Sequence, residues 1–190
     1  MRKAGRLSMR GVWFLVVARP VFRAVDFYSS YAASVRVRGG RPDAAVLAAL
    51  DARRRAAHES LAALSASHGE ACAACRGGCC TQERFRYSII DRLLADRETP
   101  NTAPRRLRDA GRERFSHYPP LRSGPPLTPG YCPRCTSEGC VMEPADRPAQ
   151  CLAYQCRATV SMLDPEQIAS GTRAVTDLMR VMVGAAHARR

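Results

Sequence analysis

The stretch Cys72-Ala-Ala-Cys75-Arg-Gly-Gly-Cys79-Cys80 brings four sulfur atoms into nine residues of a 190-residue chain. Two residues between cysteines is the spacing at which a tight turn directs both thiolates to one metal ion, and Gly77 and Gly78 let the backbone fold around it. Adjacent side chains diverge, so we expect Cys79 and Cys80 to serve two metals, or one metal and one structural role. A short structural zinc knuckle with one inert cysteine is the alternative. Thiolates favour zinc, Cu(I) or an iron-sulfur cluster over magnesium or calcium.

A second cysteine group lies between Tyr131 and Cys156, where the sequence shows little periodicity and several turn-forming residues. In such a segment we expect metal rather than a hydrophobic core to fix the chain. The chain has nine cysteines, and disulfide scaffolds are usually shorter and would leave one thiol over. We therefore interpret both groups as metal ligands. The second group comprises Cys132, Cys135, Cys140, Cys151 and Cys156.

Periodic apolar residues predict helices on either side of these groups. Residues 42–68 are rich in alanine, with leucines at helical spacing opposite a charged face that includes Arg53, Arg54 and Arg55, and Gly69 is expected to end this helix. A second helix is predicted from Thr81 to about residue 96. A third begins at residues 164–166, with Asp as its cap and Pro at its first position, and runs to about residue 186.

The Pro-rich residues 98–130 separate the two cysteine groups and are expected to form a long surface connection. The predicted fold class is therefore mainly α: a small helical domain with irregular loops, organised around a cysteine metal cluster. Folding is expected to be coupled to metal binding, because loops this poor in apolar residues do not stabilise themselves.

The formal net charge is +13, and most of it lies in residues 1–41, which hold nine basic residues against Asp26 alone. We expect residues 1–41 to be a basic N-terminal arm, disordered or arising from a mis-called start, and residues 42–190 to be the metal-binding domain. Aromatic residues interleave with the arginines, which would suit nucleic acid or an anionic membrane surface. The segment contains no recognisable module, so a solvated extension is favoured and nucleic-acid binding is not expected.

No run of about 18 apolar residues exists, which argues against an integral membrane span. Basic residues precede a short apolar run, Val12–Ala18, as in a signal peptide, but Arg19 and Pro20 follow it directly. We therefore expect a cytoplasmic protein whose thiols are kept reduced.

The two cysteine groups together resemble the YkgJ-like cysteine-cluster family, a zinc- or iron-chelating domain. The residues 72–80 quoted above correspond to its opening motif, and Cys132-Pro133 to its Cys-Pro pair. Gly139-Cys140 corresponds to its Gly-Cys pair, and Arg147-Pro148-Ala149-Gln150-Cys151 to its closing motif, with Tyr154 as the following aromatic residue. The resemblance covers roughly residues 70–160.

Two features depart from the family pattern. Three residues separate Cys75 from Cys79 where the family often has two, and Cys135 stands where an apolar residue is more usual. Cys135 is therefore left outside the expected ligand set. Seven expected ligands match the family motifs, and Cys156 is added as the eighth. Eight thiolates would fill two four-sulfur sites, or one cluster with spare thiols, and they are Cys72, Cys75, Cys79, Cys80, Cys132, Cys140, Cys151 and Cys156.

The resemblance implies binding of zinc or iron, including an iron-sulfur cluster, and no single reaction. Some relatives are linked to N-methylation of flagellin lysines, although the sequence has no glycine-rich turn for a nucleotide-like cofactor. Arg147 is expected beside the thiolates, where a guanidinium would lower their pKa values; an ordinary Arg-Pro turn is the alternative. None of the four histidines is expected to be a ligand: His58, His68, His117 and His187.

Three classes of function follow. The first is a metal-binding protein with a structural or metal-handling site and a protein partner. The second is an iron-dependent redox or protein-modifying enzyme, similar to the flagellin lysine N-methylases. The third is a zinc module that binds nucleic acid or protein. The sequence contains no convincing Cys/His nucleophile pair or carboxylate dyad, so no catalytic residue is assigned.

Overall fold

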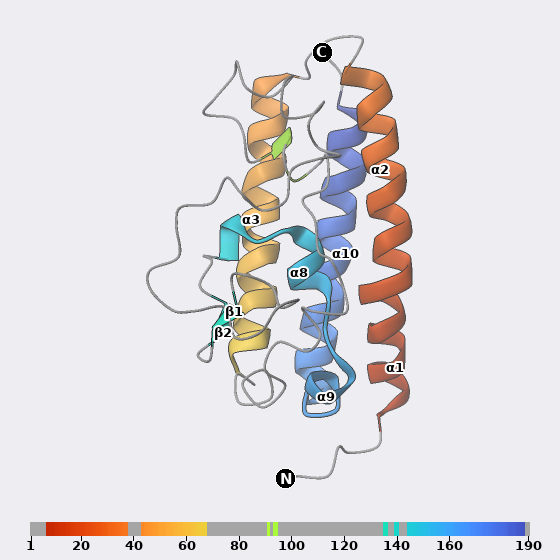
Figure 1. Cartoon of the computed structure of the whole chain (residues 1–190), viewed down its shortest axis with the longest axis vertical. Helices are drawn as coiled ribbons and strands as arrows, with labels where there is room; N and C mark the ends of the chain where they lie inside the picture. The colour runs from red at the N-terminus through yellow and green to blue at the C-terminus, as the bar shows by residue number, and fades with distance from the viewer. Residues whose placement is uncertain are drawn as a thin grey trace.

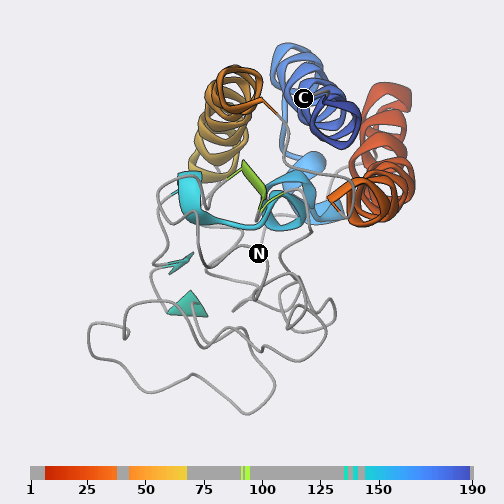
Figure 2. The same ribbon diagram turned by 90° about the horizontal axis from the view of Figure 1, so that it is seen from above.

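Three long helices form the body of the protein (Figure 1). The computed structural model describes residues 7–37, 43–67, 91, 93–94, 135–136, 139–140 and 144–188. Within that part the chain is mainly helical, as the sequence predicts. Figure 2 shows the long helices in one layer, with α10 in the middle and the shorter elements η3 and α8 on one side of that layer.

The first long helix is continuous but has a widened turn. It comprises α1 (Met9–Val16), the π-helical turn η1 (Val17–Val21) and α2 (Phe22–Val37). Ser8 caps its start by accepting a hydrogen bond from the backbone N of Gly11 at 3.1 Å. Pro20 lies inside the π turn, where a residue without an N–H group is accommodated by the wider hydrogen-bond spacing.

This helix lies within the residues that the charge distribution sets apart as a basic arm. Its inner face packs on α10, and Phe14, Val17 and Phe22 are buried there. Asp26, the acid of this segment, is also buried and accepts a hydrogen bond from Gln150 Nε2 at 2.6 Å. Residues 9–37 therefore contribute part of the core.

The other two long helices begin where the sequence predicts. α3 (Ala44–Ala66) starts after Asp43, whose Oδ1 accepts hydrogen bonds from the backbone N of Ala45 at 2.6 Å and of Val46 at 3.2 Å. α10 (Pro165–His187) starts at a capping box in which the Asp164 and Gln167 side chains each accept a bond from the other's backbone N–H. Such boxes satisfy two amide groups that a helix start otherwise leaves without partners.

α10 contacts both α3 and α1–α2 and so joins the layer together (Figure 2). The three helices approach one another at Gly171, where an added Cβ would lie 2.8 Å from Leu64 Cδ2 and 2.8 Å from Phe14 Cζ. A glycine is required there because neither a leucine branch packed in the core nor an aromatic ring can withdraw easily. The largest core side chains are almost fully buried: Phe14, Phe22, Leu61, Leu94, Leu152, Leu178 and Met182.

The remaining described elements are short. β1 (Cys135–Thr136) pairs antiparallel with β2 (Gly139–Cys140), and η3 (Pro144–Asp146), α8 (Ala149–Ala153) and α9 (Arg157–Val160) follow. Of the helix predicted over residues 81–96, only residues 91, 93 and 94 are described, and they are helical. The predicted Pro-rich connection lies outside the described residues. No helix among the described residues combines the length and apolarity that crossing a membrane requires.

Candidate functional site

A stripe of polar residues runs along the inner face of α3. Leu47, Asp51, Arg54, His58 and Leu61 follow one another in steps of four and three residues, which places them on one side of a helix. All five are buried, and the polar three are exposed by only 1%, 4% and 0% in chain order. Polar groups this deeply buried require partners, so the contacts of this stripe determine what lies against it.

Asp51 is the anionic centre of the stripe. Its Oδ1 accepts from Arg54 Nε at 2.9 Å and lies 2.9 Å from Arg54 Nη2, while its Oδ2 accepts from Arg55 Nε at 2.9 Å. Burial opposes ionisation of this carboxyl, but the hydrogen bonds and charges of the two arginines outweigh it and hold the pKa of Asp51 below its ordinary value. Asp51 is therefore an ionised carboxylate that fixes the Arg54 guanidinium.

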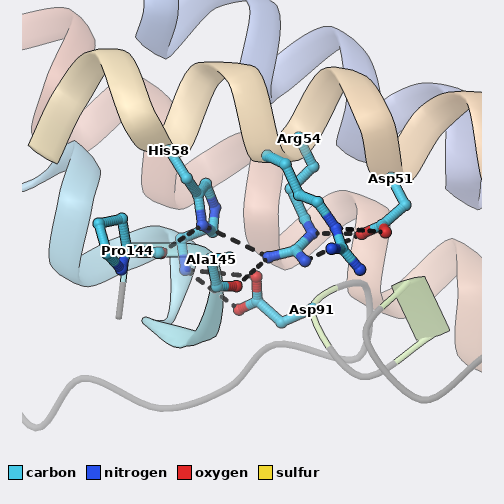
Figure 3. A network of polar contacts seen from close by, with 8 residues as sticks. Asp51, Arg54, His58, Asp91, Pro144 and Ala145 are labelled. Atoms are coloured by element: carbon cyan, nitrogen blue, oxygen red, sulfur yellow. Dashed lines mark hydrogen bonds and ion pairs between the residues drawn. The ribbon is translucent and has the colours of Figure 1, made fainter. Parts of the chain in front are cut away.

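Arg54 and His58 reach from α3 to the backbone of η3 (Figure 3). Arg54 Nη1 donates to the carbonyl oxygen of Ala145 at 2.9 Å, and His58 Nδ1 lies 3.0 Å from the carbonyl oxygen of Pro144. A carbonyl oxygen only accepts, so Nδ1 carries the proton of the neutral ring. The 3.4 Å approach of Arg54 Nη1 to that same nitrogen is then a close contact between two donors.

His58 is consequently held in its neutral form. Burial lowers the pKa of His58 from 6.5 to about 4, and the charge of Arg54 and, more weakly, that of Arg147 add to this effect. The Pro144 hydrogen bond and the Asp51 charge act in the opposite direction and are outweighed. The other ring nitrogen, Nε2, is buried and has no hydrogen-bond partner among the described residues.

The network holds residues 144–145, between Cys140 and Cys151, against α3. Further contacts hold residues 149–155. The Asp91 carboxylate accepts from the backbone N of Ala149 at 3.3 and 3.4 Å, next to Pro148 in the Arg-Pro motif (Figure 3). Gln155 Nε2 donates to Ser65 Oγ near the end of α3 at 3.2 Å. The chain from residue 65 to residue 91, which includes the first cysteine group, is thus attached at both ends to residues 149–155.

The first long helix contacts residues 154–155 from the side opposite to α3. Arg19 donates to the carbonyl oxygen of Gln155 from Nε at 3.2 Å and from Nη2 at 2.9 Å, and its guanidinium carbon lies 4.3 Å from the centre of the Tyr154 ring. Tyr154 is the aromatic residue that follows the closing Cys151 in the sequence motif. Residues 149–155 are therefore held between α1–α2 and α3.

The described cysteines of the second group fall at three places along this segment. Cys135 and Cys140 are register partners across the β1–β2 pair. Cys151 lies in α8, half-buried, and Cys156 caps α9, where its Sγ accepts from the backbone N of Thr159 at 3.3 Å and lies 3.2 Å from Thr159 Oγ1. Cys151 and Cys156 are thiols, not disulfides. The other predicted ligands lie outside the described residues: Cys72, Cys75, Cys79, Cys80 and Cys132.

Within the described ranges, no three His, Cys, Asp or Glu side chains are grouped as a metal site would require. Arg147, predicted to lie near the thiolates, is half-buried, and its backbone N donates to the carbonyl oxygen of Pro144 at 3.3 Å. Its charge also contributes to lowering the pKa of His58, which places it beside the buried network.

The helical pattern of residues 42–68 did not predict the buried network. The prediction that Arg54 lies on the exposed charged face of this helix was wrong, because Asp51 neutralises Arg54 on the inner face. Arg53 and Arg55, predicted on the same charged face, are exposed. The signal that would have found the network is the 4-3-4-3 spacing from Leu47 to Leu61, which carries three ionisable residues between two core leucines.

The chain was also compared with protein-family models, curated proteins and solved structures, and none of the three comparisons gave a match. The resemblance to the YkgJ-like family therefore remains a prediction that depends on the cysteine, Gly-Cys and Arg-Pro motifs.

Proposed function

We propose that this chain is a metal-binding protein that holds zinc or iron, the latter as single ions or an iron-sulfur cluster, through its two cysteine groups. The proposed ligands are those of the sequence analysis: Cys72, Cys75, Cys79, Cys80, Cys132, Cys140, Cys151 and Cys156. Sulfur is a soft donor, so this set suits zinc or iron and not the hard cations magnesium and calcium.

The observation that carries the proposal is the attachment of residues 65 and 91 to the segment 149–155. Cys72 is seven residues from Ser65, so at about 3.5 Å per residue it stays within about 25 Å of the Gln155 contact whatever its conformation. The chain that carries the first cysteine group is therefore anchored at both ends to the segment that holds Cys151. This anchoring supports a shared centre over two unrelated knuckles.

The thiols of Cys151 and Cys156 fit the proposal chemically. Both are half-buried, which shields a metal-thiolate bond from solvent without enclosing it. The N–H···S bond from Thr159 to Cys156 is compatible with ligation, since hydrogen bonds to ligating sulfurs are a common feature of such centres. The same bond also gives Cys156 a purely structural role, as the cap of α9.

The two roles of Cys156 are separated by Cys156→Ser. A serine oxygen is a good helix cap, so α9 keeps its hydrogen-bond acceptor while the soft ligand is lost. We expect anaerobically purified Cys156→Ser, Cys151→Ser and Cys140→Ser proteins to fold and to contain less metal than the parent, measured by elemental analysis. Thr159→Val is the matched control, because it removes the hydroxyl next to Sγ but leaves the thiol and the Thr159 backbone N–H.

The visible spectrum of the same preparations identifies the centre. Brown protein with acid-labile sulfide would indicate an iron-sulfur cluster, and colourless protein with bound zinc a zinc site. Parent protein that folds with no bound metal, or serine variants that retain the full metal content of the parent, would contradict the proposal.

A further inference from the structure

The two short strands place two cysteines opposite each other. β1 and β2 pair antiparallel, with Cys135 as the register partner of Cys140 and Thr136 as that of Gly139. The Cα atoms of register partners in an antiparallel pair are about 4.5 to 5.5 Å apart, and the two residues share one face of the ladder. A disulfide joins cysteines whose Cα atoms are about 4.4 to 6.8 Å apart. The backbone therefore places Cys135 and Cys140 within the range that a disulfide spans.

Cys135 is also the cysteine that the proposed metal centre does not require. The chain has nine cysteines, and eight thiolates already fill two four-sulfur sites. Cys140 is one of the eight proposed ligands, and Cys135 is the ninth cysteine. A thiolate outside the ligand set keeps its lone pairs for nucleophilic attack, because it shares none of them with a cation. The register thus sets a reactive cysteine beside a ligand.

We propose that Cys135 and Cys140 form a reversible disulfide under oxidising conditions, and that this bond removes Cys140 from the metal centre. The loss of a ligand rests on the proposed function, whereas the disulfide itself depends only on the strand register. The pair is then a modification site through which an oxidant releases metal.

The oxidant is a low-molecular-weight disulfide. The Cys135 thiolate attacks one of its sulfur atoms, forms a mixed disulfide on Cys135 and releases the first small thiolate. The Cys140 sulfur then attacks the Cys135 sulfur: its bond to the metal breaks, the Sγ–Sγ bond forms and the second small thiolate leaves. Two electrons pass from the cysteine pair to the oxidant, and one released thiolate takes up the proton of the Cys135 thiol. An excess of the reduced small thiol reverses both exchanges.

The helical body does not depend on the metal bond that breaks. Figure 2 shows β1 and β2 outside the helical layer, on the side that carries η3. Contacts without sulfur hold the chain that follows Cys140. Arg54 Nη1 donates to the Ala145 carbonyl oxygen at 2.9 Å, and the neighbouring Pro144 carbonyl oxygen lies 3.0 Å from His58 Nδ1. We therefore expect η3 to stay on α3 when Cys140 leaves the metal.

The test treats anaerobically purified protein with oxidised glutathione. Cleavage after Glu138 separates the two cysteines in the sequence, so fragments that remain linked in mass spectrometry identify the bond. We expect the parent to lose two hydrogen atoms in mass, to give the Cys135–Cys140 link and to release metal to a chromophoric chelator. Its far-ultraviolet circular dichroism should stay unchanged, and reduced glutathione should remove the link.

Cys135→Ser and Cys135→Ala separate the redox role from ligation. Before oxidation both variants should contain as much metal as the parent, because Cys135 is not in the ligand set. With oxidised glutathione they should release metal at least about ten-fold more slowly than the parent, since the second exchange is no longer intramolecular.

The matched control is the pair Cys151 and Cys156, which has the same four-residue separation as Cys135 and Cys140 but belongs to no strand ladder. The Cys156 sulfur accepts from the Thr159 backbone N at 3.3 Å and caps α9. A disulfide would disturb this cap, so the control pair should stay unlinked at oxidant concentrations that link Cys135 to Cys140.

Three results would overturn the proposal: no link between Cys135 and Cys140, equal linking of the control pair, or a link that forms without release of metal. A lower metal content in the Cys135 variants before oxidation would overturn it as well, because Cys135 would then be a ligand. Parent protein that contains no metal would instead contradict the proposed function. The link can still be measured on such protein, so the two failures are distinguishable.

Discussion

Acidification should destabilise this protein through His58. The folded chain holds the ring neutral, and the pKa of His58 is about 4 against 6.5 for an exposed histidine. Between these values the unfolded chain binds one more proton than the folded chain, so the free energy of unfolding falls as the pH is lowered. At about 1.4 kcal/mol per pH unit the full effect is about 3 kcal/mol, of which about 2 kcal/mol is lost by about pH 4.5.

The charged groups around His58 set the direction of this effect. Arg54 and Arg147 oppose a positive charge on the ring, and Asp51 favours it but is itself paired with two arginines. The lowered pKa of Asp51 contributes stability that is lost only as the pH falls below its ordinary value near 3.8, which lies under the histidine window. Within this network, His58 is therefore the group whose protonation lowers the stability between pH 6.5 and 4.

Urea unfolding at neutral pH and near pH 4.5, followed by far-ultraviolet circular dichroism, measures the effect. His58→Gln should lose about 2 kcal/mol less on acidification than the parent, because glutamine keeps an amide donor for the Pro144 carbonyl and does not titrate. His187→Gln, at an exposed position, should behave like the parent. A decline equally steep in His58→Gln and the parent would refute the reasoning.

Three further perturbations test the packing. Arg54→Met should lower the free energy of unfolding by about 3–5 kcal/mol in urea titrations, because it leaves the buried Asp51 carboxylate without one of its two arginine partners. The Arg55 side chain is 54% exposed, so Arg55→Ala should lower the free energy of unfolding by less than about 1 kcal/mol. Gly171→Ala should lower the free energy of unfolding by about 1–3 kcal/mol in thermal melts. Gly184→Ala should lower it less, because the added Cβ would meet only the end of the Leu50 side chain at 3.0 Å. Equal effects of the two substitutions would contradict the close approach of three helices at Gly171. Asp164→Ala should cost about 1 kcal/mol in the same melts by removing the capping box, and an unchanged melting temperature would argue against it.

The buried network also suggests how stability and metal binding are connected in the proposed function. Arg54 and His58 bind the backbone of Pro144 and Ala145, between two proposed ligands, Cys140 and Cys151. These contacts do not involve sulfur, so they can hold this segment against α3 before any metal arrives. A segment that is already positioned loses less conformational entropy on binding an ion.

The sequence by itself determined the helical class and the starts of α3 and α10. Caps such as Asp43 and Asp164 are local features whose hydrogen bonds lie within three residues, so their pattern can be read without knowing what the helix packs against. The clustering of the cysteines, and with it the proposed metal chemistry, was equally a property of the sequence.

The tertiary structure alone decided which faces are buried. Residues 9–35 are apolar on two opposite sides of one helix, so periodicity could not indicate which side meets α10 and which remains outside. Arg54 looked like a surface residue because burial of a charge depends on partners that the helical pattern does not show, here the Asp51 carboxylate and the backbone of η3. Such pairing joins residues up to 91 positions apart, and no local pattern encodes it.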